Sequence, residues 1–181
     1  RYNTSYILEV YFDDNSINNI VYKDLPNVPH SFENATFGSY QGRSVIIGYD
    51  QCFEFDQEEY QVIPSLNVNR SFAASTFIQN KVVVAGGYDN DLLDSIEILD
   101  WDESKHGSQW NISPSRLPIE VHSHTLVTFN SKLFMIGGRG DGSNDLDTIW
   151  EGRFDKLSDR IEWVEMGLRL QKKRKYHFSF V

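Results

Sequence analysis

The sequence of 181 residues has little cysteine and no excess of basic residues. Its single cysteine, Cys52, can form neither an internal disulfide nor a zinc site built from several thiolates. The chain has 17 Lys and Arg against 26 Asp and Glu, which gives a formal net charge of -9. Binding to a phosphate backbone needs the opposite balance. The composition therefore argues against a nucleic-acid partner and favours a partner with basic groups.

The chain also lacks long apolar runs. No stretch reaches the roughly 18 apolar residues of a membrane-spanning helix, and the first residues do not show the charged-then-apolar pattern of a signal peptide. Sequons of the N-x-S/T type begin at Asn3, Asn34, Asn69 and Asn111, which is compatible with secretion if they are exposed. The compartment therefore stays open between the cytoplasm, which we favour, and secretion.

A repeated segment organises the sequence. Residues 30–37 overlay residues 70–77 at an offset of 40, and residues 122–129 follow the second copy at an offset of 52. Each copy opens with a basic or imidazole residue followed by Ser, and each ends in Thr-Phe. A period of this length indicates an architecture built from repeated structural units.

Each copy leads into a short apolar run that ends in glycine. The three runs are Ser44–Gly48, Lys81–Gly87 and Lys132–Gly138. Their length and β-branched content predict strands that are buried on both faces. We expect the glycines to end the strand because the backbone there needs a positive φ or a close approach that a Cβ would block.

Two further markers complete each unit. A Glu followed by an aromatic-Asp pair marks a third segment, and a large aromatic residue marks a fourth, so the unit contains four strands. Because a residue that returns in every unit serves the unit, whereas an active site breaks such symmetry, we interpret the Glu residues as structural. The markers are Glu9, Glu54, Glu97 and Glu151 for the third segment, and Tyr60, Trp110 and Trp163 for the fourth.

Four short strands with a glycine pair and a late aromatic residue resemble the kelch repeat, whose units form the blades of a β-propeller. The resemblance implies an all-β chain that forms a partial β-propeller, with about three full four-stranded kelch blades and incomplete flanking blades. We expect residues 1–29 to end one blade, residues 30–69, 70–121 and 122–174 to form the full blades, and residues 175–181 to start another.

The resemblance also implies a function. In kelch propellers, the loops between second and third strands and those that join successive blades lie on one face and commonly hold a partner protein. We therefore expect a protein-protein interaction module, such as the substrate-recognition or scaffold part of an adaptor, with no catalytic residues and no cofactor. The candidate partner-binding residues are Tyr88, Asp89, Asp91, Arg116, Arg139, Asp141 and Arg174.

An enzymatic alternative comes from galactose-oxidase-like copper enzymes, which share the propeller architecture. Their chemistry needs a Cys-Tyr cross-link and two His around copper. Cys52 is available and Tyr is plentiful, but no matching cluster of ligands is visible in the sequence. A buried structural thiol explains Cys52 better.

Shorter motifs have structural explanations that we favour over functional ones. His122 and His124 lie two residues apart on a predicted strand, a spacing that could suit a metal. Residues 139–141 spell an integrin-type tripeptide, residues 141–147 offer oxygen ligands for calcium, and residues 172–175 form a basic run. We interpret all of them as parts of the repeat or as solvated loops, and we predict no metal site.

Overall fold

The computed structural model of the chain describes residues 5–13, 16–25, 34–40, 43–56, 59–101 and 109–179. Within these residues the secondary structure is β-strand, apart from one 3-10 turn, η1 (Asp141–Ser143). No helix in this part of the chain is long and apolar enough to cross a membrane. The sequon at Asn3 and the side chain of Glu9 lie outside the described residues.

Three antiparallel sheets of four strands make up most of the fold, and in each the strands follow chain order. Sheet 1 consists of β3 (Thr36–Tyr40), β4 (Arg43–Ile47), β5 (Cys52–Phe55) and β6 (Tyr60–Ile63). Sheet 2 consists of β7 (Ala74–Ile78), β8 (Lys81–Ala85), β11 (Ser95–Asp100) and β12 (Asn111–Arg116). Sheet 3 consists of β13 (Thr125–Phe129), β14 (Lys132–Ile136), β15 (Thr148–Asp155) and β16 (Arg160–Arg169).

Two shorter antiparallel pairs complete the described secondary structure. β1 (Ser5–Asp13) pairs with β2 (Ser16–Leu25), with a bulge near Tyr11. β9 (Tyr88–Asp89) pairs with β10 (Asp91–Leu92) in a small ribbon within the loop that joins β8 to β11 of sheet 2.

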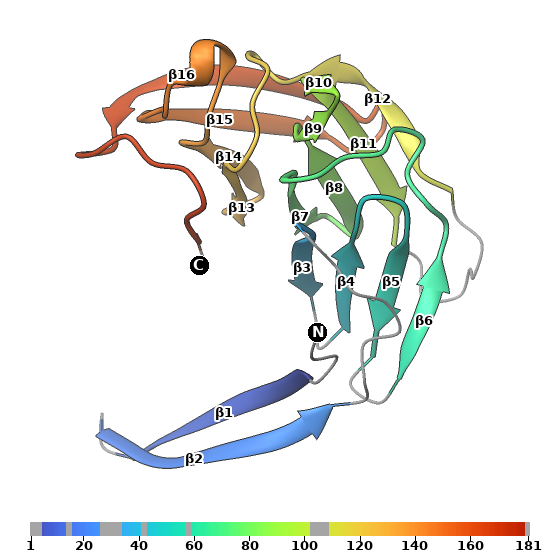
Figure 1. Cartoon of the computed structure of the whole chain (residues 1–181), viewed down its shortest axis with the longest axis vertical. Coiled ribbons are helices and arrows are strands. Elements are labelled where there is room, and N and C mark those ends of the chain that lie inside the picture. The colour runs from blue at the N-terminus through green and yellow to red at the C-terminus, as the bar shows by residue number, and fades with distance from the viewer. Residues whose placement is uncertain are drawn as a thin grey trace.

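The three large sheets are arranged around a common axis (Figure 1). Their first strands lie at the inner edge, where β7 contacts both β3 and β13, and their last strands lie on the outside. This arrangement confirms the predicted all-β, partial β-propeller of four-stranded blades. The blade limits at residues 29, 69, 121 and 174 remain a prediction.

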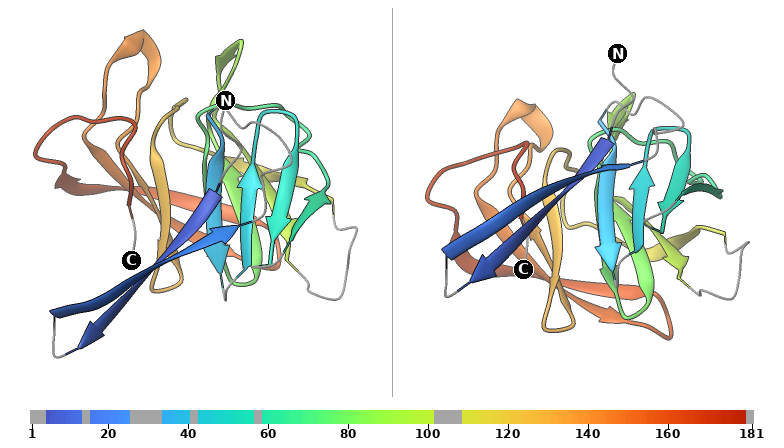
Figure 2. Two further views of the ribbon diagram at one scale, coloured as in Figure 1. Left: turned by 60° about the horizontal axis from the view of Figure 1, so that its bottom comes forward. Right: turned by 90° about the horizontal axis from the view of Figure 1, so that it is seen from below.

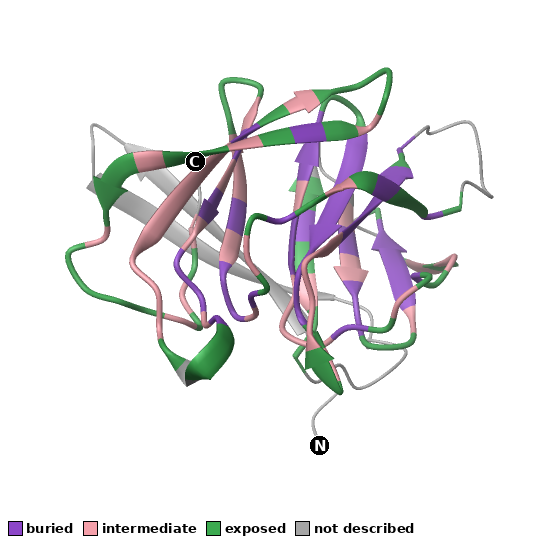
Figure 3. Cartoon of the chain, turned by 90° about the horizontal axis from the view of Figure 1, so that it is seen from above, coloured by how far each residue is buried: buried purple, intermediate pink, exposed green. Residues whose placement is uncertain are grey.

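The hydrophobic core forms two layers between neighbouring sheets. Val82 and Val84 of β8 pack toward Val45 and Ile47 of sheet 1, whereas Val83 packs toward sheet 3. Successive side chains of a strand point to opposite faces, and all three β8 valines have no exposed surface. β8 is therefore buried on both faces, as the sequence predicts (Figure 3).

The glycine pairs end the second strands for the expected reason. Gly86 and Gly137 have φ values of 63° and 59°, in the left-handed region that favours glycine. A Cβ at Gly86 would lie 2.5 Å from the carbonyl oxygen of Val121, and one at Gly137 would lie 2.8 Å from that of Arg174. Both the positive φ and the close approach are therefore confirmed.

The alignment of the opening segments was wrong by one or two residues. Thr36, Ala74 and Thr125 are equivalent, because each pairs with the last residue of the second strand in its sheet. The offsets are therefore 38 and 51, not 40 and 52. Two-residue turns at 79–80 and 130–131, with positive φ at each residue, fix the register of their hairpins.

The recurring Glu residues do not all share one register either. Glu54 and Glu151 pair with the third residue of the preceding strand, whereas Glu97 pairs with the fourth, Val84. Because the side-chain period of a strand is two, Glu97 projects from the opposite face of its sheet, toward sheet 1. The assumption of strict symmetry was therefore wrong for Glu97.

Glu97 has the structural role that was predicted for it. Its carboxylate lies 2.8 Å from the guanidinium of Arg70, and neither side chain has exposed surface. The same carboxylate accepts hydrogen bonds from the backbone N–H groups of Asn67 (2.7 Å) and Val68 (3.0 Å). Arg70 also donates to the carbonyl oxygen of Gly86 at 2.9 Å. This buried network fastens the connection between sheets 1 and 2 onto sheet 2.

Backbone hydrogen bonds link successive blades close to the axis. The amide of Phe72 donates to Asn34, that of Ser123 donates to Phe72, and that of Tyr176 donates to Ser123, over 2.8–3.0 Å. All four residues have positive φ, between 51° and 60°. We call this series the axial ladder. Its repetition in a strained conformation shows that the connections enter successive blades in the same way.

Candidate functional site

The candidate binding loops emerge together at one end of the blades (Figure 2). Because the strands are antiparallel, the loops after the second strands and the connections after the fourth strands lie at the same end. We call this end the loop face and define it as residues 48–51, 64–73, 86–94, 117–124, 137–147 and 170–176. The predicted binding residues lie in these segments, except for Arg116, which immediately precedes one of them.

The loop of sheet 2 presents Tyr88 and Asp89 on the β9–β10 ribbon. Tyr88 exchanges two backbone hydrogen bonds with Ser71, at 2.9 and 3.0 Å, and its side chain is 44% exposed. Tyr49, in the loop between β4 and β5, donates a hydrogen bond from its hydroxyl to Asp89 at 2.7 Å, and this bond raises the pKa of Tyr49. Asp91 is exposed on the second strand of the ribbon. The ribbon is thus held at its base while its side chains remain accessible.

The loop of sheet 3 is anchored in a similar way. Arg139 exchanges two backbone hydrogen bonds with His122, at 2.8 and 3.0 Å. Its side chain lies 3.8 Å from Asp145, and Lys175 approaches the same carboxylate oxygen at 3.8 Å. Asp141 is exposed at the start of η1, where it accepts a hydrogen bond from the next amide. The integrin-type tripeptide is thus part of a folded loop.

The other two predicted residues differ in their surroundings. Arg116 ends β12 and forms an ion pair with Asp94 near the outer side of the loop face. Arg174 is exposed, but its backbone is fixed between Gly138 and Leu146 by hydrogen bonds of 2.9 and 3.0 Å. Its neighbours Lys172 and Lys173 are also exposed. The structure therefore presents the basic run in an ordered connection.

An aromatic contact series crosses the loop face, and sequence reasoning missed half of it. The ring centroids of Tyr88 and His122 are 6.5 Å apart, those of His122 and Phe72 are 5.8 Å apart, and those of Phe72 and Tyr176 are 5.6 Å apart. We call these four residues the aromatic seam. Phe72 and Tyr176 were missed because the sequence places them in predicted strands. Their left-handed backbone conformation takes them out of those strands, and no sequence signal indicates it.

Residues 69–105, which contain most of sheet 2, match the kelch motif. Kelch-like protein 41a from Danio rerio is 24% identical to the chain over 124 residues, which cover 65% of this chain and 19% of that protein. The motif match and this relative support a kelch-repeat family. Kelch propellers are generally protein-interaction modules.

The solved structure of YjhT has a fold similar to that of this kelch chain. The two share a TM-score of 0.65 and 13% sequence identity, over 78% of this chain and 48% of YjhT. At this identity the likeness concerns the fold alone. The matched kelch region spans about half of YjhT and about a fifth of the curated relative.

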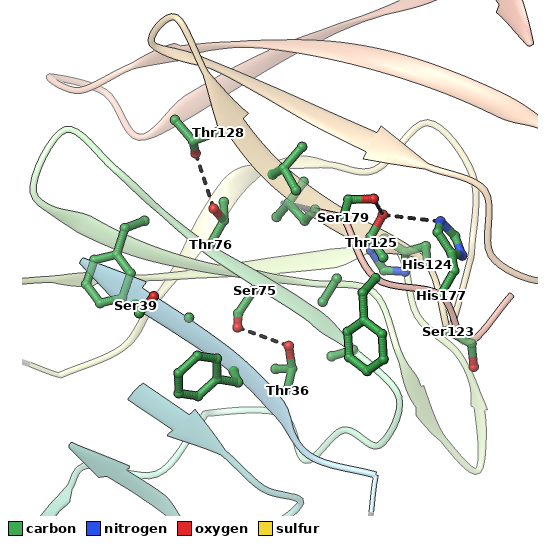
Figure 4. A pocket seen from close by; sticks show the side chains of 18 of the residues that line it. Thr36, Ser39, Ser75, Thr76, Ser123, His124, Thr125, Thr128, His177 and Ser179 are labelled. Carbon is green, nitrogen blue, oxygen red and sulfur yellow. Dashed lines mark hydrogen bonds between the residues drawn. The ribbon is translucent and has the colours of Figure 1, made fainter. Parts of the chain in front are cut away.

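A groove of about 1010 Å³ runs along the axis of the kelch blades, lined by β3, β7, β13 and residues 176–179 (Figure 4). Hydroxyl groups of neighbouring first strands pair across it. Thr36 and Ser75 are 3.0 Å apart, and Thr76 and Thr128 are 3.3 Å apart. These pairs show that part of the polar lining holds the blades to one another.

The predicted placement of His122 and His124 on a strand was wrong. His122 and His124 precede β13, and Ser123 between them has a φ of 54°. Burial lowers the pKa of His124 to about 3, and burial also lowers the pKa of His122 and His177. The described residues contain no group of three or more metal-ligating side chains, so the calcium interpretation of residues 141–147 gains no support.

Cys52 lies in the core between sheets 1 and 2. Burial raises the pKa of its thiol to about 12, so the nucleophilic thiolate form is scarce at neutral pH. The predicted buried structural thiol is therefore confirmed. The sequon residues Asn34, Asn69 and Asn111 are exposed, and their glycosylation remains a prediction.

Proposed function

We propose that this kelch chain is a protein-protein interaction module that binds another protein through its loop face, as the substrate-recognition or scaffold part of a larger adaptor. The observation that carries the proposal is the aromatic seam, which lies across several loops and is accessible at Tyr88 and Tyr176, 44% and 58% exposed. Aromatic residues and Arg dominate the energy of protein interfaces.

The rigidity of the loops supports this proposal. Tyr88 and Arg139 are each held by a pair of backbone hydrogen bonds to a neighbouring connection. A surface that is ordered before binding loses little conformational entropy when a partner docks. Loops of this kind on a β-scaffold are well suited to recognition.

The groove offers less support for catalysis. Two pairs of its hydroxyls join neighbouring blades, and both ring nitrogens of His124 are buried without a hydrogen-bond partner. A general base must reach the proton that it removes, and the nitrogens of His124 are covered. These features favour binding at the loop face over a reaction at the axis.

Affinity capture followed by quantitative mass spectrometry tests the proposal. We expect the Tyr88→Ala, Arg139→Ala variant to lose the partners that the unmodified chain retains, because the seam and its neighbouring cation are truncated. The matched control is Leu157→Ala, Arg160→Ala, which removes an exposed apolar residue and an Arg at the opposite end of sheet 3. Undiminished capture by the loop variant, with unchanged thermal stability in all three proteins, would remove the proposal.

A further inference from the structure

The two ends of the aromatic seam lie in segments of opposite charge. Tyr88 belongs to residues 86–94, which contain three Asp and no Lys or Arg. Tyr176 belongs to residues 170–176, which contain four consecutive Lys and Arg residues and no Asp or Glu. The loop face therefore changes from acidic to basic along the seam.

The three carboxylates at the acidic end, residues 86–94, differ in their hydrogen-bond and ion-pair partners. Asp89 accepts hydrogen bonds from Tyr49 and Asn90, and Asp94 forms an ion pair with Arg116. Asp91 is exposed on β10. Hydrogen bonds from a hydroxyl or an amide leave the negative charge of Asp89 in place. The acidic end can thus attract a basic side chain.

The cations at the basic end are mostly accessible. Lys172, Lys173 and Arg174 are exposed, and Lys175 lies 5.3 Å from the centroid of the Tyr176 ring. Lys175 shares Asp145 with Arg139 at 3.8 Å. The loop of sheet 3, residues 137–147, also contains Asp141 and Asp147. Together with residues 170–176 it therefore has three carboxylates and five cations.

We propose that the loop face is a bipolar docking site for an extended segment of a partner protein, in which an apolar or aromatic side chain separates a basic residue from an acidic one. The proposal rests on the proposed function and specifies the chemistry of its partner. The apolar side chain packs on the seam, the basic residue meets the end at residues 86–94, and the acidic residue meets residues 170–176.

The dimensions of the seam set the length of that segment. Three ring-to-ring steps of 5.6–6.5 Å separate Tyr88 from Tyr176. The sum of these steps is an upper limit on the span, and an extended chain rises about 3.3 Å per residue, so at most about five or six residues are needed to span the seam. Electrostatic complementarity at both ends would fix the orientation of the segment and reject segments with a single sign of charge.

Selection from a library of random seven-residue peptides displayed on phage tests this chemistry without assuming a partner. The folded chain is the target, and Asp89→Lys, Asp91→Lys and Lys172→Glu, Lys173→Glu invert one end each. Glu59→Lys, Glu162→Lys is the matched control, because it changes two exposed carboxylates away from the loop face. Thermal unfolding checks that every variant remains folded.

We expect the unmodified chain and the control to enrich peptides with a basic and an acidic residue on either side of an apolar one. The Asp89→Lys, Asp91→Lys variant should lose only the preference for the basic residue. The Lys172→Glu, Lys173→Glu variant should lose only the preference for the acidic residue. In fluorescence polarisation, each inversion should weaken binding of one enriched peptide about tenfold, which corresponds to ~1.4 kcal/mol.

Enrichment of acidic peptides alone would mean that the basic connection acts by itself, and it would overturn the bipolar site. The same holds if no charge pattern is enriched, or if the inverted variants keep the original preference. Loss of partner capture by Tyr88→Ala, Arg139→Ala combined with any of these results would retain the interaction function and overturn only the partner chemistry.

Discussion

Sheets 2 and 3 share the same strand order and the same apolar run that ends in two glycines, yet they are buried differently. All five residues of β8 are buried, whereas the residues of β14 alternate between buried and half-buried. Figure 3 shows the same contrast across the two sheets. Sheet 2 lies between two neighbours, while one face of sheet 3 has none within the described residues. Position in the ring therefore decides how far a given repeat is buried.

Equivalent residues make this contrast quantitative. Ile96 pairs with Ala85 at the end of β8, and Ile149 pairs with Ile136 at the end of β14. Ile96 has no exposed surface, whereas Ile149 is half-buried. Both project from the equivalent face of their sheets, so the same residue type at the same register differs only in what covers it.

The largest expected effect comes from breaking the buried ion pair of sheet 2. Glu97→Ala leaves the guanidinium of Arg70 buried without its carboxylate, which should lower the free energy of unfolding by about 3–5 kcal/mol. Chemical denaturation monitored by tryptophan fluorescence measures this change.

The control for that experiment is Glu151→Ala in sheet 3. Glu151 contacts Lys132 and Arg153, whose side chains are 43% and 64% exposed, so water can replace the lost interactions. We expect almost no change in unfolding free energy. Equal losses in both variants would mean that the two sheets do not differ in the way proposed.

A smaller effect is expected from truncating the equivalent isoleucines. Ile96→Ala should cost about 3 kcal/mol, because it opens a cavity between two packed sheets. Ile149→Ala should cost less than half as much, since its side chain already contacts solvent. The midpoints of urea denaturation, compared at the same dependence of unfolding free energy on urea, measure both values. A larger loss of stability for Ile149→Ala than for Ile96→Ala would contradict the assignment of the uncovered face.

The smallest effect concerns pH. The folded chain holds His124 neutral, with a pKa of about 3, whereas the unfolded value is near 6.5. Between these values the unfolded state binds one more proton, so stability falls as pH decreases, by about 1.4 kcal/mol per unit and about 2 kcal/mol at pH 5. His124→Ala should remove this slope from the pH dependence of unfolding. Alanine is suitable because Ala73 occupies the same position in the preceding blade.

His177→Ala provides the matched comparison. His177, in the connection that follows sheet 3, is the residue equivalent to His124. It is half-buried, and burial lowers its pKa as well. Its substitution should flatten the acid slope less than His124→Ala does. If His124→Ala left the slope unchanged, burial between the blades could not be the cause of the acid sensitivity.

The strands and their ends could be predicted from sequence because they depend on local chemistry. Short β-branched runs such as Val82–Ala85 form strands wherever neighbours cover them, and the following Gly86 and Gly87 adopt positive φ. The loops at one end follow from the antiparallel order alone. This placed Tyr88 and Arg139 correctly on a common face.

The exact register could not be predicted in the same way. The overlay relied on Thr-Phe pairs, but the pairing of the β7–β8 and β13–β14 hairpins is set by their two-residue turns. The contact of Arg70 with Glu97 spans 27 residues and depends on the packing of a connection against another sheet. Phe72 and Tyr176 read as strand residues in sequence, and only their backbone conformation brings them to the loop face.

The axial ladder bears on how such chains diverge. Its hydrogen bonds join only main-chain atoms, although the side chains of the four residues are chemically different: Asn34, Phe72, Ser123 and Tyr176. Because peptide groups are common to nearly all residues, substitution at these positions can proceed without severing the link between blades. This accounts for three sheets that share one geometry although the residues of the ladder differ from blade to blade.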